Sequence, residues 1–301
     1  MTNQESNFDN PDTLLDDFIH RHNITATPFV KRELNAIYWT IRSKLEIDND
    51  LNNHAEKLDH LDPLWGLLRS MLDRIFEYVE GAIVAYVTGS TASSEIISRT
   101  VVESAVNLLF ILVDDRKGNR LTQYFAHYFE NEQKEIDNWA KATSQLTGKA
   151  QKVHQAATTE KRKQINELQK ATDYSLLQIG LPATKDLAVK FPPISKRFEL
   201  LKLDVAYRTV YAALCSQTHN DAEDLLNYFF ATLSDDQQLI EKTAIDTVNF
   251  SRLMLYYAVE YFVMVASGFA IRFELTNTFE SLRLGQDVIS QTLEEIAKEL
   301  Q

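Results

Sequence analysis

Glycine and proline are scarce in this sequence, with 8 glycines and 6 prolines among 301 residues. A β-rich or α/β protein of this length needs many more of both for its turns and phosphate-binding loops. The scarcity therefore favours long helices with few connections. Plentiful Ala, Leu, Glu, Gln and Lys, all good helix formers, agree with this. We expect an all-α fold, a multi-helix bundle.

Cysteine is represented by a single residue, Cys215. One cysteine excludes an intramolecular disulfide framework and a zinc site built from several thiolates. The first twelve residues also lack the basic start and apolar core of a signal peptide. We therefore expect a protein of the reducing cytoplasm.

The common catalytic and cofactor motifs are missing as well. Gly89 is followed by small and hydroxylated residues, but the Gly-Lys-Ser/Thr ending of a nucleotide-binding loop is absent. The sequence contains neither His-Glu-x-x-His nor Cys-x-x-Cys, nor the Glu-x-x-His pairs of di-iron bundles. We expect no metal and no cofactor, so any activity must come from scattered polar side chains.

Net charge and hydropathy restrict the partners. The net charge of −12 argues against broad, nonspecific binding of nucleic acid, although a local basic groove remains compatible with it.

The only apolar stretch near membrane-spanning length, Met254–Phe273, contains Glu260 in its interior. Such a segment is more typical of a buried central helix than of a bilayer span, so we expect no membrane; membrane association through it is a minor alternative.

Hydrophobic periodicity suggests a domain organisation. Residues 1–60 would form an N-terminal helical extension and residues 61–301 the main helical bundle, in which residues 143–194 are a polar arm and connector. Within that arm, residues 149–170 hold six Lys and Arg against two Glu, typical of a solvent-facing helix or a mobile loop. A polar stretch at 48–53 breaks the helical pattern. The predicted helices are 13–22, 28–45, 64–87, 93–113, 120–142, 195–216, 221–233, 241–273 and 276–300.

One polar constellation lies on the predicted helix 93–113. Glu95, Arg99 and Glu103 are spaced four residues apart and therefore share one helical face. They can form a structural ion pair that ties two helices together. Alternatively, Arg99 contacts an anion, most simply a phosphate, while Glu103 holds its guanidinium in place.

A second constellation ends the predicted helix 195–216. Tyr207, Tyr211, Cys215 and His219 recur every fourth residue, and Ser216 precedes His219 by three. A histidine at a helix junction can be a hydrogen-bonded structural residue, or it can titrate near neutral pH and act as acid or base. A Ser-His hydrolase is disfavoured, because a serine inside a helix lacks the constrained turn and oxyanion donors that such a nucleophile needs.

Two stretches carry a resemblance to a known family. ISRTVVESAVNLLFIL (97–112), followed about a hundred residues later by VYAALCSQTHND (210–221), resembles a bacterial family of helical proteins of unknown function. The resemblance covers about residues 64–233. That family pairs an Arg-x-x-x-Glu helix with a later Tyr-x-x-x-Ser-x-x-x-His-like segment. This chain departs from the pattern, since Tyr211 precedes Ser216 by five residues and Ser216 precedes His219 by three.

The same family distantly resembles HEPN domains, helical bundles that include metal-independent ribonucleases and nucleotide-binding modules of bacterial defence and toxin systems. Their nuclease signature is Arg-x(4–6)-His near a helix end. Arg208 and His219 are too far apart for it. Arg120 and His127 fit the spacing, but 14 arginines and 7 histidines produce about one such match by chance.

The resemblance implies a pocket for a phosphate-bearing ligand, RNA or a nucleotide, and a role in bacterial defence. We expect Arg99 and His219 as catalytic residues of a metal-independent ribonuclease, and Glu103, Tyr211 and Ser216 as ligand-positioning residues. The competing hypothesis is a noncatalytic interaction or regulatory scaffold with a protein partner, such as a homodimer, in which these side chains are core polar contacts.

Overall fold

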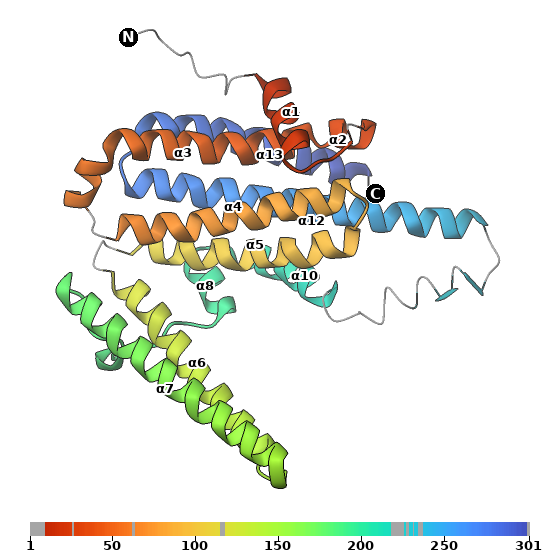
Figure 1. The fold of residues 1–301 in the computed structure, drawn as a ribbon. Coiled ribbons are helices and arrows are strands. Elements are labelled where there is room, and N and C mark those ends of the chain that lie inside the picture. The colour runs from red at the N-terminus through yellow and green to blue at the C-terminus, as the bar shows by residue number, and fades with distance from the viewer. Residues whose placement is uncertain are drawn as a thin grey trace. The chain divides into compact units, whose positions relative to one another are not determined.

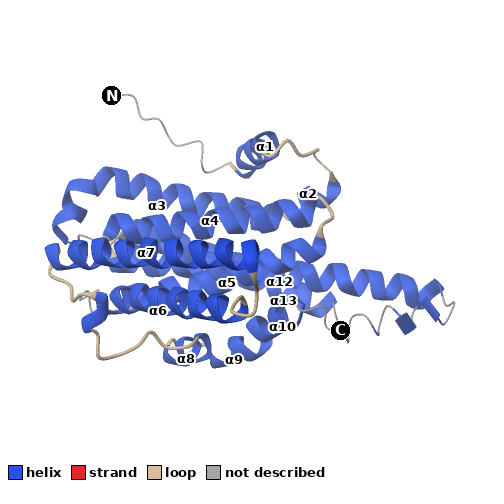
Figure 2. Cartoon of the chain, turned by 60° about the horizontal axis from the view of Figure 1, so that its bottom comes forward, coloured by secondary structure: helices blue, strands red, loops and turns tan. Residues whose placement is uncertain are grey.

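The computed structural model describes residues 10–25, 27–61, 64–114, 118–217, 226, 229–230, 232–233 and 237–299. In this part of the chain every regular element is a helix and no strand is present (Figure 2). The predicted all-α fold is therefore confirmed. The chain divides into two compact units, residues 1–112 with 194–301, and residues 113–193.

Five long helices run alongside one another in the first unit (Figure 1). Helix α12 contacts the other four and is the central helix of this bundle. Its side chains Tyr256, Phe262 and Phe269 are fully buried, as expected for a helix that is apolar on all sides. The five helices are α3 (Leu34–Leu61), α4 (Trp65–Val87), α5 (Thr91–Leu112), α12 (Gln237–Arg272) and α13 (Thr276–Glu299).

Helix α12 is the one described helix that is long and apolar enough to cross a membrane. Its most apolar window is 72% buried inside the protein. That burial is what a core helix of a soluble protein shows, and it accords with the prediction that Met254–Phe273 forms a central helix.

Two short helices precede the bundle, α1 (Pro11–Arg21) and α2 (Pro28–Arg32). Each begins with a proline in its first turn and a capping side chain: Asn10 accepts from an amide of α1, and Thr27 accepts from an amide of α2. The prediction of a single helix over 28–45 is thus wrong in its continuity, because α2 ends at Arg32 and the chain turns at Glu33 before α3 begins.

The break predicted at residues 48–53 is wrong, since α3 continues to Leu61. Ile47 and Leu51 lie one turn apart and are both fully buried, so the apolar stripe of α3 persists through the polar stretch. This helix lies within the predicted extension 1–60, and it packs against α4, α12 and α13 of the bundle.

The second unit is a helical hairpin of α6 (Asn119–Ala142) and α7 (Gly148–Gln178), followed by the short η2 (Thr184–Asp186). Phe129, Ile136 and Ile165 form its small core. Residues 149–170, for which a helix and a loop were both considered, are helical throughout. Two of their cations pair with α6: Lys161 lies 2.9 Å from Glu132, and Arg162 lies 2.8 Å from Asp137.

Candidate functional site

Helix α5 carries the candidate site. One face of this helix packs against α4 and α12 through buried apolar residues such as Val102 and Val106. Another face holds a stripe of mostly polar residues that lines a cavity of about 310 Å³. The stripe follows helical spacing and consists of Ile96, Arg99, Thr100, Glu103, Ser104 and Asn107.

Two of the five predicted site residues, Arg99 and Glu103, line this cavity, and a third, Tyr211, contacts both of them. The buried Tyr211 donates a hydrogen bond of 3.0 Å from its hydroxyl to Oε2 of Glu103. The guanidinium carbon of Arg99 lies 5.9 Å from the centre of the Tyr211 ring, within cation–π range. The predicted pairing of the Arg99 helix with the segment of Tyr211 is therefore present, and the two protein segments are 108 residues apart.

The protonation equilibria of Arg99 and Tyr211 are shifted by their neighbours at this site. Burial lowers the pKa of Arg99, but the hydrogen bond with Tyr211 and the nearby Cys215, Tyr211 and Glu103 raise it, and the balance lies above the ordinary value. Burial and the adjacent negative charge of Glu103 raise the pKa of the Tyr211 hydroxyl. At neutral pH the site therefore holds a fixed cation, Arg99, and a protonated phenol that donates to Glu103.

The segment that carries Tyr211 is not the single helix predicted for 195–216. It is divided into α8 (Ile194–Leu200), α9 (Asp204–Ala206), the π-helical turn η3 (Tyr207–Tyr211) and α10 (Ala212–Gln217). Lys202 adopts a left-handed conformation with φ of 64°, which ends α8.

The π-helical turn stacks the rings of Tyr207 and Tyr211, whose centres are 5.7 Å apart. The buried Phe198 of α8 packs against both rings. Single π-helical turns are frequent at functional sites, and this one presents the Tyr211 hydroxyl to α5.

The other two predicted site residues, Ser216 and His219, lie where the described part of the chain ends. His219 lies outside the described residues. Ser216 belongs to α10, but its side chain is likewise outside them. The predicted proximity of Arg99 and His219 therefore stays a prediction.

Glu95, the first member of the predicted constellation, does not face the cavity. It is buried and accepts a hydrogen bond from the hydroxyl of Ser251 on α12. The shared face expected for Glu95, Arg99 and Glu103 is therefore split: Glu95 faces α12, while Arg99 and Glu103 line the cavity. Arg120 and His127 both lie on α6 of the second unit.

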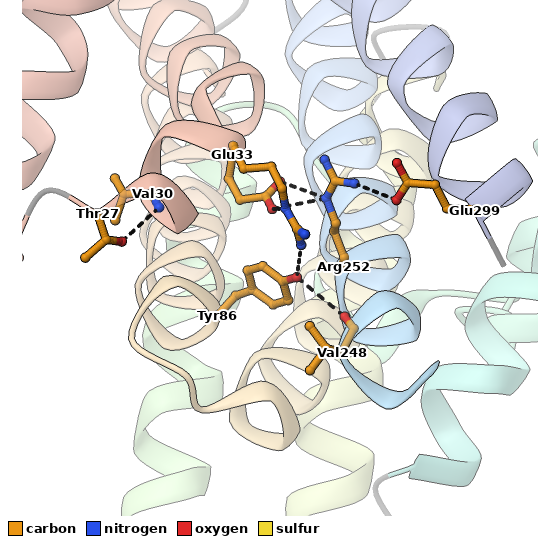
Figure 3. A network of polar contacts seen from close by, with 8 residues as sticks. Thr27, Val30, Glu33, Tyr86, Val248, Arg252 and Glu299 are labelled. Atoms are coloured by element: carbon orange, nitrogen blue, oxygen red, sulfur yellow. Dashed lines mark hydrogen bonds and ion pairs between the residues drawn. The ribbon is translucent and has the colours of Figure 1, made fainter. Parts of the chain in front are cut away.

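Sequence reasoning missed a buried ionic network at one end of the bundle (Figure 3). Glu33 is fully buried, and both of its carboxylate oxygens accept from Nε of Arg252, at 3.0 and 3.1 Å. Arg32 donates to the same carboxylate at 2.8 Å and to the hydroxyl of Tyr86 at 3.0 Å. Arg252 also donates to Glu299 of α13 at 3.3 Å. The network links the start of α3 to α4, α12 and α13 and lines neither described cavity.

A larger cavity of about 510 Å³ lies between α1, α3 and α4. Its two cations are already ion-paired. Lys44 contacts Asp48 and Asp73, and Arg21 lies 2.6 Å from Glu80. The described residues contain no group of three or more His, Cys, Asp or Glu side chains that could hold a metal ion. The α5 cavity is therefore the site that the geometry favours.

Comparison with known proteins gives one match. Residues 66–238 match the model of a family of unknown function (DUF5677). No curated protein and no solved structure matches the chain. The match confirms the resemblance to a family of unknown function over nearly the predicted range, and nothing found supports the further likeness to HEPN domains.

Proposed function

Since the chain belongs to this family of unknown function, we propose its activity from its own residues: the cavity on α5 binds a small phosphate-bearing ligand, and Arg99 contacts the phosphate. The observation that carries the proposal is the position of Arg99. Arg99 lines a cavity large enough for a small molecule, and its guanidinium lies against the Tyr211 ring in the field of the nearby Glu103.

The chemistry of the lining supports an anion. A guanidinium is always charged, and its planar fork of donors matches the oxygens of a phosphate. Tyr211 and Glu103 hold the side chain before the ligand arrives, which reduces the entropy lost on binding. The hydroxyls of Thr100 and Ser104 add groups that can both donate and accept hydrogen bonds along the cavity.

The finer proposal is metal-independent cleavage of RNA in the cytoplasm, the activity that the HEPN resemblance implies. The ribose 2′-oxygen would attack the adjacent phosphorus, and the P–O5′ bond would break to leave a 2′,3′-cyclic phosphate. One group must accept the 2′ proton and another must supply a proton to the departing O5′. We propose His219 for one of these transfers and Arg99 for neutralising the phosphate, with Ser216 positioning them.

Calorimetric titration of the full chain with inorganic phosphate and with nucleoside monophosphates tests the binding. One charge-assisted hydrogen bond contributes about 1.5–3 kcal/mol, so Arg99→Ala should weaken binding by roughly tenfold or more. The matched control is Arg283→Ala on α13, an exposed arginine paired with Glu280 at 3.1 Å, which should leave binding unchanged. The melting temperature of both variants should stay within a few degrees of the parent.

The outcomes separate the hypotheses. If no phosphate ligand binds and Arg99→Ala unfolds the protein, the Arg99–Glu103–Tyr211 contacts are a structural tie, as in the noncatalytic scaffold hypothesis. Cleavage of an RNA pool in the presence of EDTA, abolished by His219→Ala, would support the catalytic proposal. Binding without cleavage would retain the ligand site and remove the ribonuclease.

A further inference from the structure

We propose that Asn107 makes this site selective for a nucleotide whose base carries a carbonyl oxygen at the position where cytosine and adenine carry an amino group, that is, a uridine or guanosine phosphate. The inference rests on the proposed function, because it assigns the end of the same cavity that lies farthest along α5 from Arg99. It follows from how the amide of Asn107 is oriented and from what separates it from Arg99.

The orientation of the Asn107 amide is set by Arg197. This arginine belongs to α8, is buried, and donates from its guanidinium to Oδ1 of Asn107. A guanidinium carries only donors, so it can face the oxygen of the amide but not the nitrogen. The amide nitrogen Nδ2 is therefore the group that Asn107 has left for a ligand. No acceptor for Nδ2 is found among the residues that the structure describes.

The position of Asn107 sets the length of the ligand. Asn107 and Arg99 both line the cavity and are eight residues apart on α5, which corresponds to about 12 Å along the helix. Thr100 and Ser104 lie between them on the same face. The cavity thus offers a fixed cation at one end, two hydroxyls and the Glu103 carboxylate, which accepts from Tyr211, in the middle, and an amide donor at the other end. A nucleoside monophosphate has the complementary order: phosphate, sugar hydroxyls and base edge.

The donor at Asn107 distinguishes the bases. Uracil and guanine present a carbonyl oxygen that accepts from an amide N–H. Adenine and cytosine carry an exocyclic amino group at the corresponding position, N6 or N4, which is itself a donor and leaves the Nδ2 hydrogens facing hydrogens there. Asn107 is half-buried, so the wrong base loses this hydrogen bond and places two donors against each other. We expect uridine and guanosine monophosphates to bind at least roughly tenfold more tightly than adenosine and cytidine monophosphates.

Asn107→Asp tests the inference without removing the support that Arg197 receives. A carboxylate still accepts from Arg197, so the melting temperature should be maintained. The donor toward the ligand is replaced by an acceptor, however, so the affinity for uridine and guanosine monophosphates should fall, and the preference should disappear or turn toward the adenosine and cytidine compounds, whose amino groups donate. Asn107→Ala serves as the comparison variant, since it removes both the donor and the acceptor for Arg197 and should also lower the melting temperature.

Inorganic phosphate, titrated into the same variants, separates this inference from the proposed function. Its binding should depend on Arg99 and be nearly unchanged in Asn107→Asp. If the parent protein binds all four monophosphates equally, or if Asn107→Asp keeps the preference, the selectivity assigned to Asn107 is wrong while the phosphate site stands. If phosphate and all nucleotides fail to bind the parent protein, both proposals are overturned.

Discussion

The hydroxyl of Tyr211 donates to Oε2 of Glu103 over 3.0 Å, and this bond joins the π-helical turn η3 to the central part of α5. Each partner constrains the other. Burial and the charge of Glu103 raise the pKa of the phenol and keep it protonated, and the phenol supplies a donor to a half-buried carboxylate. Arg99 lies against the ring of the same tyrosine. Tyr211 therefore sets the geometry of both charged groups at the cavity.

Tyr211→Phe should lower the free energy of unfolding by about 1–3 kcal/mol, because Glu103 loses a donor in a partly desolvated position. Urea denaturation measures the change. Tyr207→Phe is the matched control: this neighbouring tyrosine stacks on Tyr211 and is only half-buried, and the change should be within about 0.5 kcal/mol of the parent. Equal effects of the two substitutions would contradict the importance assigned to the Tyr211–Glu103 bond.

The buried tyrosine Tyr86 predicts a loss of stability in alkali. Burial and the nearby charge of Glu33 raise the pKa of Tyr86 to about 12, above the ordinary value of 10.0. The folded protein then holds this proton more tightly than the unfolded chain between these values. Its contribution to stability is complete below pH 10 and declines as the pH rises toward 12.

Urea denaturation between pH 8 and 12 tests this expectation, with phenolate absorbance recorded in parallel. The free energy of unfolding should decline above pH 10, and Tyr86→Phe should decline less steeply than the parent. Tyr211, Tyr256 and Tyr261 also have pKa values raised chiefly by burial, so Tyr86→Phe should retain part of the slope. Identical slopes in the parent and the variant would refute the contribution of Tyr86.

For the Glu33–Arg252 pair, we expect the single substitution Arg252→Met to lower the free energy of unfolding more than the double substitution that removes both charges. Among the residues that the structure describes, Arg252→Met leaves the fully buried Glu33 carboxylate with Arg32 alone as an ion-pair partner, and it should cost about 3–5 kcal/mol of unfolding free energy. Glu33→Gln combined with Arg252→Met removes both buried charges and should recover a large part of that loss. Chemical denaturation of the single and double variants checks the recovery. If the double variant is less stable than the Arg252→Met variant, the charge-burial argument does not hold.

The outline of this fold was accessible from sequence because long helices with few interruptions leave a clear pattern. Helices α4, α5, α6, α12 and α13 lie within a few residues of the predicted bounds. Failures occurred where tertiary contacts overrode local composition. Ile47 and Leu51 maintain α3 through a polar stretch, and the left-handed Lys202 divides a segment that has continuous helix-forming residues.

The site was accessible only in part. The spacing of Arg99 and Glu103 correctly placed both on one face of α5, and the later Tyr211 does meet them. Asn107 and Arg197 were missed, because nothing in the sequence shows that α8 brings a buried guanidinium to the end of α5. Glu33 did leave a signal: it falls in the apolar stripe between Val30 and Ile37, where a charged residue must find a buried partner.

Removing the charge of Glu260 on α12 should stabilise the folded protein at neutral pH. Burial raises the pKa of this carboxyl above 4.5, although a hydrogen bond from Ser290 at 3.1 Å acts in the opposite direction. Because the folded pKa exceeds the unfolded one, the contribution of Glu260 to stability is present below pH 4.5 and is lost as the pH rises through the folded value. Glu260→Gln should therefore be more stable than the parent at pH 7, with the difference shrinking toward pH 4. Denaturation at both pH values measures this, and a variant less stable at pH 7 would contradict it.

Two helical glycines should respond oppositely to alanine. A Cβ atom at Gly285 of α13 would lie 2.8 Å from Cζ3 and 2.9 Å from Cδ2 of the buried Trp39, so Gly285→Ala must displace the indole or separate α13 from α3. We expect a loss of about 1–3 kcal/mol from this overpacking. Gly66, near the start of α4, has open space around such an atom. Gly66→Ala should gain about 0.4–1 kcal/mol, because alanine loses less backbone entropy on folding. Thermal and urea denaturation of both variants measure the two effects. Tolerance of Gly285→Ala would show that the packing of α13 on α3 is looser than the contact between Gly285 and Trp39 requires, and destabilisation by Gly66→Ala would contradict the open space at that position.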